Sequence, residues 1–89
     1  MPQRILKIQN NLGLHARPAS LFVAEAGKYR SQIFVSKDGM RVSGKSIVGI
    51  LMLAAGKDST ITIEAVGDDA EDALDGLEDL VVRRKFDEE

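Results

Sequence analysis

The chain has 89 residues, no cysteine, one histidine and four aromatic residues, and its formal net charge is −2. This length is enough for a single compact domain over residues 1–89 and too short for a second lobe. The lack of cysteine excludes disulfides and thiolate metal sites, and one histidine excludes most histidine-rich zinc sites, so we expect neither a metal ion nor a cofactor.

Charge is unevenly distributed along the chain. Residues 1–63 hold nine Lys or Arg and three Asp or Glu, a charge of +6, whereas residues 64–89 hold three and eleven, a charge of −8. Two interpretations are open: a solvated acidic helix packed on a mildly basic body, or a basic surface that meets an acidic partner or a phosphate. Nucleic acid is not an expected partner, because no run of Lys or Arg is interleaved with aromatic residues. No stretch approaches the roughly 18 apolar residues of a membrane span, so we expect a soluble, cytoplasmic protein without a membrane partner.

The first third of the chain predicts a strand and a helix. Leu6 and Ile8 alternate with polar residues, which predicts a strand over residues 3–9. Over residues 16–28 the apolar positions recur at i, i+3, i+4 and i+7, which predicts an amphipathic helix. Gly27 lies near its end, where left-handed backbone is commonly needed.

The middle of the chain predicts a hairpin and a short helix. Apolar and polar residues alternate on both sides of the dipeptide Asp38-Gly39, the pattern of a β-hairpin with a tight turn. Ser46 can N-cap a helix over residues 47–55 that stops at Gly56. On helical geometry, positions 50, 53 and 54 share a face that can pack onto the sheet.

The last third predicts a strand and a long helix. TITIEAV alternates strictly over residues 60–66, and the helix that follows has acidic residues in its first turn. Its apolar positions keep helical spacing: Ala70, Ala73, Leu74, Leu77, Leu80 and Val81. Only the tail FDEE, residues 86–89, is expected to be loose. The order β-α-β-β-α-β-α with alternating strands predicts an α+β fold, in which three helices cover one face of a sheet.

Residues 39–46, GMRVSGKS, fit the pattern G-x-x-x-x-G-K-[ST] of a nucleotide-binding P-loop. That loop must leave a buried strand and enter a helix with its N–H groups curled around the phosphates. Here Gly39 lies in the predicted hairpin turn and residues 40–43 in a strand, so the segment is extended. We therefore reject the interpretation as a nucleotide-binding enzyme.

The only histidine lies in LGLHARPAS, at the predicted start of the first helix. Gly13 allows unusual backbone angles just before it, and Pro18 leaves only Ala16 and Arg17 to offer a first-turn N–H group to an anion. The helix N-terminus and Arg17 disfavour the imidazolium form, and a neutral imidazole is a nucleophile. His15 can therefore accept a phosphoryl group, although an ordinary surface or capping histidine is the alternative.

LGLHARPAS, followed by GKSIVGILMLAAGKDSTITI, resembles the HPr family, the histidine-containing phosphocarriers of the bacterial phosphoenolpyruvate-dependent sugar phosphotransferase system. The resemblance covers essentially the whole chain. It implies an HPr-like open-faced β-sandwich of βαββαβα order, with a four-stranded antiparallel sheet and three helices on one face. It also implies a monomer that carries phosphoryl groups covalently and is not itself an enzyme.

The resemblance also assigns roles to residues. His15 matches the histidine that accepts phosphate from enzyme I at Nδ1 and passes it to an enzyme IIA domain, and Arg17 matches the arginine that assists. Ser46 matches a serine that an HPr kinase/phosphorylase modifies in some bacteria. The partner-docking patch matches Ile47, Val48 and Leu51, which share one face of the predicted helix.

Several alternatives remain open. Leu12 replaces the small polar residue of many sugar-branch carriers, so the nitrogen-branch carrier is an alternative. A regulatory interaction module that binds through the Ser46 helix and makes little use of His15 is another. Ser46 could also be only an N-cap, and the three patch residues could be core. Phosphate on Ser46 would place negative charge beside the patch and impair docking of a partner that approaches His15.

Overall fold

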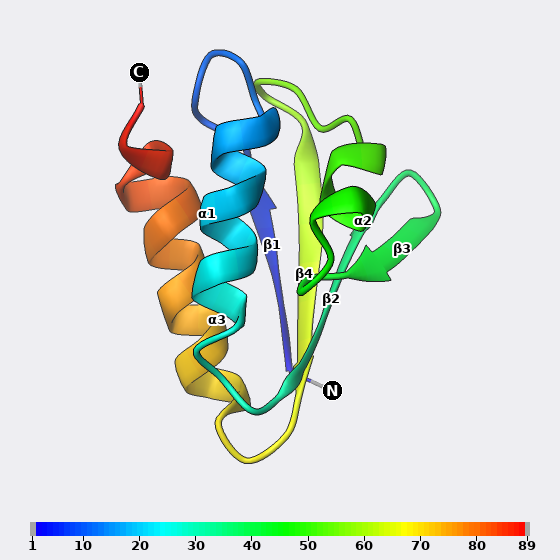
Figure 1. The fold of residues 1–89 in the computed structure, drawn as a ribbon, viewed down its shortest axis with the longest axis vertical. Helices are drawn as coiled ribbons and strands as arrows, with labels where there is room; N and C mark the ends of the chain where they lie inside the picture. The colour runs from blue at the N-terminus through cyan, green and yellow to red at the C-terminus, as the bar shows by residue number, and fades with distance from the viewer. Residues whose placement is uncertain (1, 89) are drawn as a thin grey trace.

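The computed structural model describes residues 2–88, which fold in the order predicted from the sequence (Figure 1). The elements are β1 (Gln3–Lys7), α1 (Ala16–Ala26), β2 (Gln32–Lys37), β3 (Met40–Ser43), α2 (Ile47–Met52), β4 (Thr60–Val66) and α3 (Ala70–Glu78). A π-helical turn, η1 (Asp79–Arg83), extends α3, and a short turn, η2 (Lys85–Asp87), follows it.

The four strands form one antiparallel sheet in the order β1-β4-β2-β3. The register places Leu6 opposite Ile61 and Val35 opposite Ile63, so the apolar residues of neighbouring strands meet on one face. Figure 1 shows α1, α2 and α3 on one side of this sheet. The α+β open-faced sandwich is therefore confirmed.

The core lies between the sheet and the helices. Its largest fully buried side chains come from every layer, and they are Phe22, Phe86, Ile8, Ile33, Ile50, Ile61, Ile63, Leu74, Leu77, Leu80, Val35 and Val81. Burial of one such side chain contributes about 1.5–3 kcal/mol. The apolar stripe predicted for the last helix is buried throughout, which confirms its helical spacing.

The other face of the sheet is open to solvent. Ile5 is 68% exposed there. The guanidinium of Arg41 lies over the ring of Phe34, 3.8 Å from its centroid, and its Nε donates to Glu64 at 3.2 Å. A charged side chain therefore shields the aromatic residue of the open face.

Three boundaries differ from the sequence prediction. β1 ends at Lys7, although Ile8 still exchanges backbone hydrogen bonds with residues 58 and 59. Gly27 is right-handed (φ −66°), so the expected left-handed cap is wrong; the chain leaves α1 through further i→i+3 hydrogen bonds. α2 stops at Met52 because Ala54 is left-handed (φ 51°), and this alanine is exposed instead of packed on the sheet.

The expectation of a loose tail is wrong for residues 86–88. Phe86 is fully buried in the core, and Glu88 is hydrogen-bonded to the main body. Lys85, Phe86 and Asp87 all have positive φ, between 51° and 57°. Left-handed backbone costs about 1–2 kcal/mol for each residue that is not glycine. The contacts of the tail must offset that strain. Glu89 lies outside the described residues.

The segment that matched a P-loop has the extended geometry expected from the sequence. Gly39 has a positive φ of 85° in the β2–β3 turn, and residues 40–43 form β3. Lys45 donates through Nζ to the carbonyl of Tyr29 at 2.7 Å. The segment therefore comprises a hairpin turn, strand β3 and the residues that follow this strand. The side chain of Lys45 is hydrogen-bonded to the backbone.

Candidate functional site

The loop between β1 and α1 is held by hydrogen bonds and places His15 at the start of α1. Gly13 is left-handed (φ 66°), and a Cβ at this position would overlap the carbonyl oxygen of Ala55. Asn10 donates to the carbonyl of Gly13 at 2.8 Å, and the N–H of Leu14 donates to Ala55 at 2.8 Å. His15 then takes the N-cap position with extended backbone (φ −80°, ψ −172°), as the sequence predicted.

The first turn of α1 has free donors. Ala16 and Arg17 are the first two helical residues, and Pro18 in third place has no N–H. The N–H of Ala19 bonds to the carbonyl of His15 at 2.9 Å. Among residues 2–88, the N–H groups of Ala16 and Arg17 have no hydrogen-bond partner. They are exposed at a helix N-terminus, a position that favours anions.

The tail carboxylate of Glu88 faces the imidazole. Both Glu88 oxygens lie 3.1 Å from His15 Nε2. Oε1 also accepts from Asn10 Nδ2 at 3.0 Å, and Oε2 accepts from Arg17 Nη1 at 3.1 Å. These contacts, led by the His15 hydrogen bond, lower the pKa of Glu88 below its ordinary value. The carboxylate therefore meets three donors and has no proton to give.

This arrangement determines which ring nitrogen carries the proton. Asn10 Nδ2 faces two acceptors, Gly13 O and Glu88 Oε1, which fixes the orientation of its amide. Because an ionised carboxylate only accepts hydrogen bonds, Nε2 must be the donor to Glu88. In the neutral ring the lone pair is then on Nδ1, which has no hydrogen-bond partner among residues 2–88. His15 is about one-third exposed, so an incoming group can reach it.

Arg17 links the tail to the helix start. Its Nη1 donates to the carbonyl of Phe86 at 3.1 Å as well as to Glu88. The side chain remains 55% exposed. A guanidinium held by one edge has further N–H groups free for another anion.

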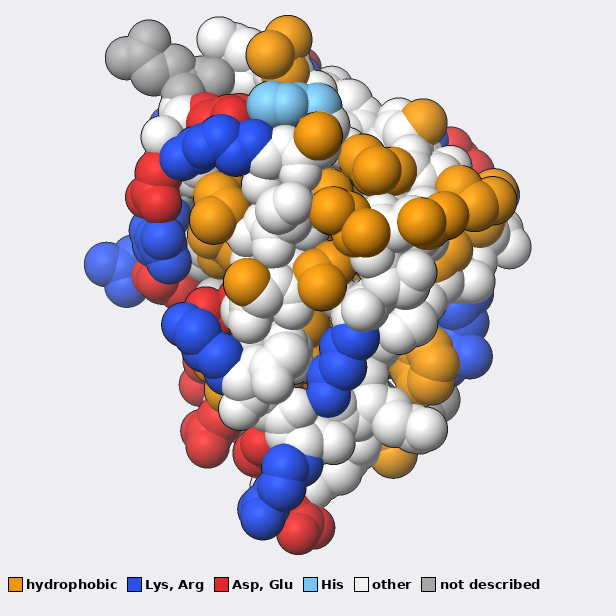
Figure 2. All heavy atoms as spheres, viewed as in Figure 1, with side chains coloured by type: hydrophobic (Ala, Val, Ile, Leu, Met, Phe, Trp, Pro, Cys, Tyr) orange, Lys and Arg blue, Asp and Glu red, His pale blue; other side chains and the backbone are white. Residues whose placement is uncertain are grey.

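Ser46 and the predicted apolar patch lie on α2. Ser46 is the N-cap, and its hydroxyl accepts from the N–H of Gly49 at 3.1 Å, without a second capping contact. Ile47, Val48 and Leu51 are 39%, 64% and 40% exposed, whereas Ile50 of the same helix is fully buried. In Figure 2 apolar side chains gather on one side of the histidine and mixed charged side chains on the other. The structure thus brings an exposed apolar patch to the surface that carries His15.

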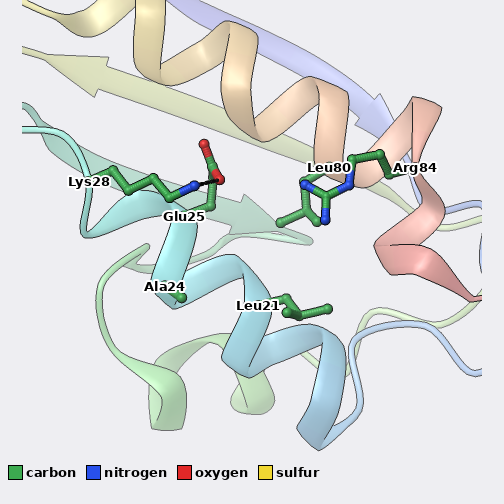
Figure 3. A pocket seen from close by; sticks show the side chains of 6 residues that line it. All are labelled: Leu21, Ala24, Glu25, Lys28, Leu80 and Arg84. Carbon is green, nitrogen blue, oxygen red and sulfur yellow. Dashed lines mark hydrogen bonds and ion pairs between the residues drawn. The ribbon is translucent and has the colours of Figure 1, made fainter.

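A shallow pocket lies between α1 and the C-terminal helix (Figure 3). Its volume is about 130 Å³. It is lined by Leu21, Ala24, Glu25, Lys28, Leu80 and Arg84. Small-molecule sites usually enclose about 300–1,000 Å³, so this pocket is too small for one. The carboxylate of Glu25 already accepts hydrogen bonds from Lys28 Nζ at 2.9 Å and Tyr29 Oη at 2.8 Å.

Among residues 2–88, no cluster of three or more His, Cys, Asp or Glu side chains could hold a metal ion. No helix in the same range is long and apolar enough to cross a membrane.

The sequence indicated the positions of His15, Ala16, Arg17 and Ser46 but missed Glu88 and Asn10. Glu88 lies 73 residues from His15 in the chain, and its acidic neighbours resemble an unstructured terminus. The one available signal was Phe86, a large apolar residue within the acidic tail. In the sequence, Asn10 has the pattern of a turn residue, although the structure buries it fully.

Comparison with known proteins agrees with this geometry. A sequence profile described as "PTS HPr component phosphorylation site" matches residues 2–83. Phosphocarrier protein HPr of Cupriavidus necator is 45% identical over 84 residues, covering 94% of each chain. HPr-like protein Crh of Halalkalibacterium halodurans is 44% identical over 77 residues, covering 86% of this chain and 92% of the relative. The crystal structure of HPr-C-His from Thermoanaerobacter tengcongensis superposes with a TM-score of 0.95 at 46% identity, covering 100% of this chain and 99% of that one. The chain therefore belongs to the HPr family of phosphocarriers of the phosphotransferase system.

Proposed function

We propose that this chain, as one domain and a monomer in the cytoplasm, accepts a phosphoryl group from phospho-enzyme I on Nδ1 of His15 and passes it to an enzyme IIA domain. The observation that carries the proposal is the free Nδ1 of a histidine at the N-cap of α1. In the transfer the bond from Nδ1 to phosphorus forms while the bond from phosphorus to the donor breaks. The chain is itself the phosphoryl acceptor in one transfer and the donor in the next, and it turns over no substrate of its own, so it acts as a carrier and not as an enzyme.

The groups around Nδ1 support this role. The unpaired N–H groups of Ala16 and Arg17 and the exposed guanidinium of Arg17 offer donors to the phosphoryl oxygens. A helix N-terminus contributes about 0.3–1 kcal/mol to anion binding, and up to about 2 kcal/mol where partly buried. This stabilisation is modest, which suits a group that must be passed on.

The exposed patch of Ile47, Val48 and Leu51 supports protein partners over small substrates. Apolar side chains at this exposure are typical of an interface core, and the pocket between α1 and η1 is too small for a small-molecule site. We assign the patch to transient docking of enzyme I and the IIA domain.

Incubation with phosphoenolpyruvate and enzyme I tests the carrier role. Wild type is expected to gain one acid-labile adduct of about 80 Da, the mass of one phosphoryl group. His15→Ala should gain none, while Ser46→Ala, which leaves Nδ1 intact, should still gain it. If His15→Ala is labelled as fully as wild type, the assignment of His15 is wrong.

Regulation at Ser46 is a second candidate, favoured by the resemblance to the HPr-like protein Crh. Ser46 is half-buried at a helix N-terminus, directly before the docking patch. An HPr kinase/phosphorylase could place phosphate there without loss of the fold, because helix N-termini favour anions. If enzyme I never labels the protein but a serine kinase does, the chain is a regulatory module.

The branch of the phosphotransferase system depends on the acceptor. Leu12 is 73% exposed, so an acceptor domain can contact its side chain. Phosphorylated protein offered to sugar-branch and nitrogen-branch IIA domains in parallel should transfer faster to one of them, which identifies the branch.

A further inference from the structure

The tail residue Glu88 has no role in the family assignment, yet its side chain contacts the candidate site directly. Its carboxylate is joined to His15 Nε2, Asn10 Nδ2 and Arg17 Nη1 at 3.0–3.1 Å. Only 18% of the side chain is exposed. An ordinary surface glutamate at a chain end would be solvated instead.

The backbone before Glu88 is built to hold this carboxylate in place. Phe86 is buried in the core, and its carbonyl accepts from Arg17. The N–H of Glu88 bonds to the carbonyl of Lys85 at 3.0 Å, closing the left-handed turn. Asp87 pairs with Arg84 at 2.7 Å on the outer side. Three consecutive left-handed residues persist only where surrounding contacts enforce them, and such strain concentrates at functional sites.

We propose that Glu88 is a positioning residue for phosphoryl transfer: its carboxylate keeps the proton of His15 on Nε2 and the attacking lone pair on Nδ1. This inference rests on the carrier function for its kinetic part, but the position of the proton can be measured without any partner. The role proposed for Glu88 is like that of the carboxylate in a catalytic triad, which orients the ring of the reacting histidine.

The electron balance of the cycle explains why a carboxylate suits this position. The neutral ring, protonated at Nε2, attacks phosphorus through Nδ1 and thereby acquires a positive charge. Glu88 lies against the Nε2–H that shares this charge, so the phosphorylated ring is stabilised without losing a proton. On transfer to the acceptor, the phosphorus–Nδ1 bond breaks, its electron pair returns to Nδ1, and the ring is again neutral with its proton on Nε2.

Nitrogen-15 NMR of histidine-labelled protein at mildly alkaline pH measures the position of the proton. Wild type should show an N–H signal at Nε2 that exchanges slowly with water, and a bare Nδ1. Glu88→Ala should lose the slow N–H signal and show shifts averaged between the two tautomers, whereas Glu88→Asp should restore part of the wild-type pattern. Asp68→Asn is the control, because it removes an exposed carboxylate that lies before α3, at the other end of the C-terminal helix from Glu88. Identical nitrogen shifts in wild type and Glu88→Ala would overturn the proposal.

Kinetics with phospho-enzyme I test the consequence. Glu88→Ala should lower kcat about tenfold, the loss of one hydrogen bond to a charged group, with KM nearly unchanged. Asp68→Asn should leave both constants unchanged. A Glu88→Ala variant that is phosphorylated faster than wild type would show that the tail obstructs the site, and this too overturns the proposal. If no variant, wild type included, is labelled, the carrier function fails while the NMR result still stands on its own.

Discussion

Arg17 donates in the unphosphorylated protein to the Phe86 carbonyl and to the Glu88 carboxylate. A phosphoryl group on Nδ1 would be a second anion within reach of the same helix start, because Arg17 is the second residue of α1. The guanidinium presents several donors in one plane, so it can hold the tail by one edge and the phosphoryl group by another. Lysine offers a single compact ammonium and lacks this planar arrangement of donors.

Arg17→Lys is therefore expected to be a damaging substitution. It should slow phosphorylation by enzyme I about tenfold, because a planar set of donors is replaced by one point charge. Stopped-flow or quench measurement of phospho-His15 formation checks this. Arg30→Lys, at an exposed position outside the site, is the control and should behave as wild type. An Arg17→Lys variant at wild-type rate would remove Arg17 from the transfer step.

Two substitutions of Ser46 separate the effect of negative charge from the effect of helix capping. Asp and Asn both cap helices well, but only Asp adds a negative charge. Ser46→Asp should weaken phosphorylation by enzyme I and raise its KM, while Ser46→Asn should match wild type in rate and in unfolding free energy. The two variants are compared by steady-state kinetics and urea unfolding. If Ser46→Asp is phosphorylated as fast as Ser46→Asn, charge at this position does not regulate docking.

At the scale of elements, α2 presents two faces with different roles. Its buried face, with Ile50, holds the helix on the sheet, and its exposed face carries the proposed docking patch. The sequence predicted this division because positions three and four apart share a face. It could not predict that the helix ends at Met52, since the left-handed residue is Ala54 and not a glycine, which would have been a local signal.

Val48→Asp tests the docking face. Val48 is 64% exposed, so the substitution should leave the free energy of unfolding within about 0.5 kcal/mol of wild type. It should raise the KM for enzyme I about tenfold or more by placing a charge in an apolar interface. Ile5→Asp is the matched control, because Ile5 is 68% exposed on the open face of the sheet. Equal effects of the two substitutions would contradict docking through α2.

The C-terminal turn is the element that sequence reasoning missed. Short polar segments after a helix usually remain solvated, and neither positive φ at three residues nor the π-helical turn η1 has a residue signature here. Phe86 anchors the turn, and Phe86→Ala should lower the free energy of unfolding by about 3 kcal/mol, the usual cost of removing a buried phenylalanine. Phe86→Leu should cost less than half as much. A loss below about 1 kcal/mol in urea unfolding would show that the tail is not docked in solution.

At the scale of the whole molecule, the acidic C-terminal helix is tied to the basic body by specific contacts. Arg4 of β1 pairs with three carboxylates of α3: Glu71 at 3.1 Å, Asp75 at 2.7 Å and Glu78 at 2.8 Å. Asp69, before α3, accepts from the N–H groups of Arg30 and Ser31 at 2.9 Å each. These contacts support the interpretation as an acidic helix packed on a mildly basic body, whereas a basic surface that meets an acidic partner or a phosphate stays a prediction.

Stability should fall in acid, and Asp69 should account for part of the fall. Its hydrogen bonds, led by the Ser31 hydroxyl, lower its pKa from 3.8 to about 2. A lowered pKa stabilises the fold when the carboxylate is ionised, so this contribution is complete above pH 4 and is lost as pH falls toward 2. Urea midpoints measured between pH 5 and pH 2 should drop for wild type and drop less for Asp69→Asn. A parallel pH dependence in both would show that Asp69 does not contribute.

How much of the structure could be predicted from the sequence depends on how far apart in the chain the interacting residues lie. Alternation and helical spacing are local, so the seven elements, the buried faces and the N-cap positions of His15 and Ser46 could be predicted from the sequence. The contacts of Glu88, Asn10 and Arg4 join residues that are distant in the chain or depend on packing, and no spacing rule encodes them.

Onward transfer is the most direct test of the account, because a carrier must give up what it accepts. Protein phosphorylated on His15 is separated from enzyme I and phosphoenolpyruvate and mixed with an equal amount of an enzyme IIA domain, and phosphohistidine is followed on both proteins. The account predicts that the phosphoryl group leaves His15 much faster than by hydrolysis and appears on the acceptor. Loss to inorganic phosphate alone, with sugar-branch and nitrogen-branch IIA domains alike, would contradict it.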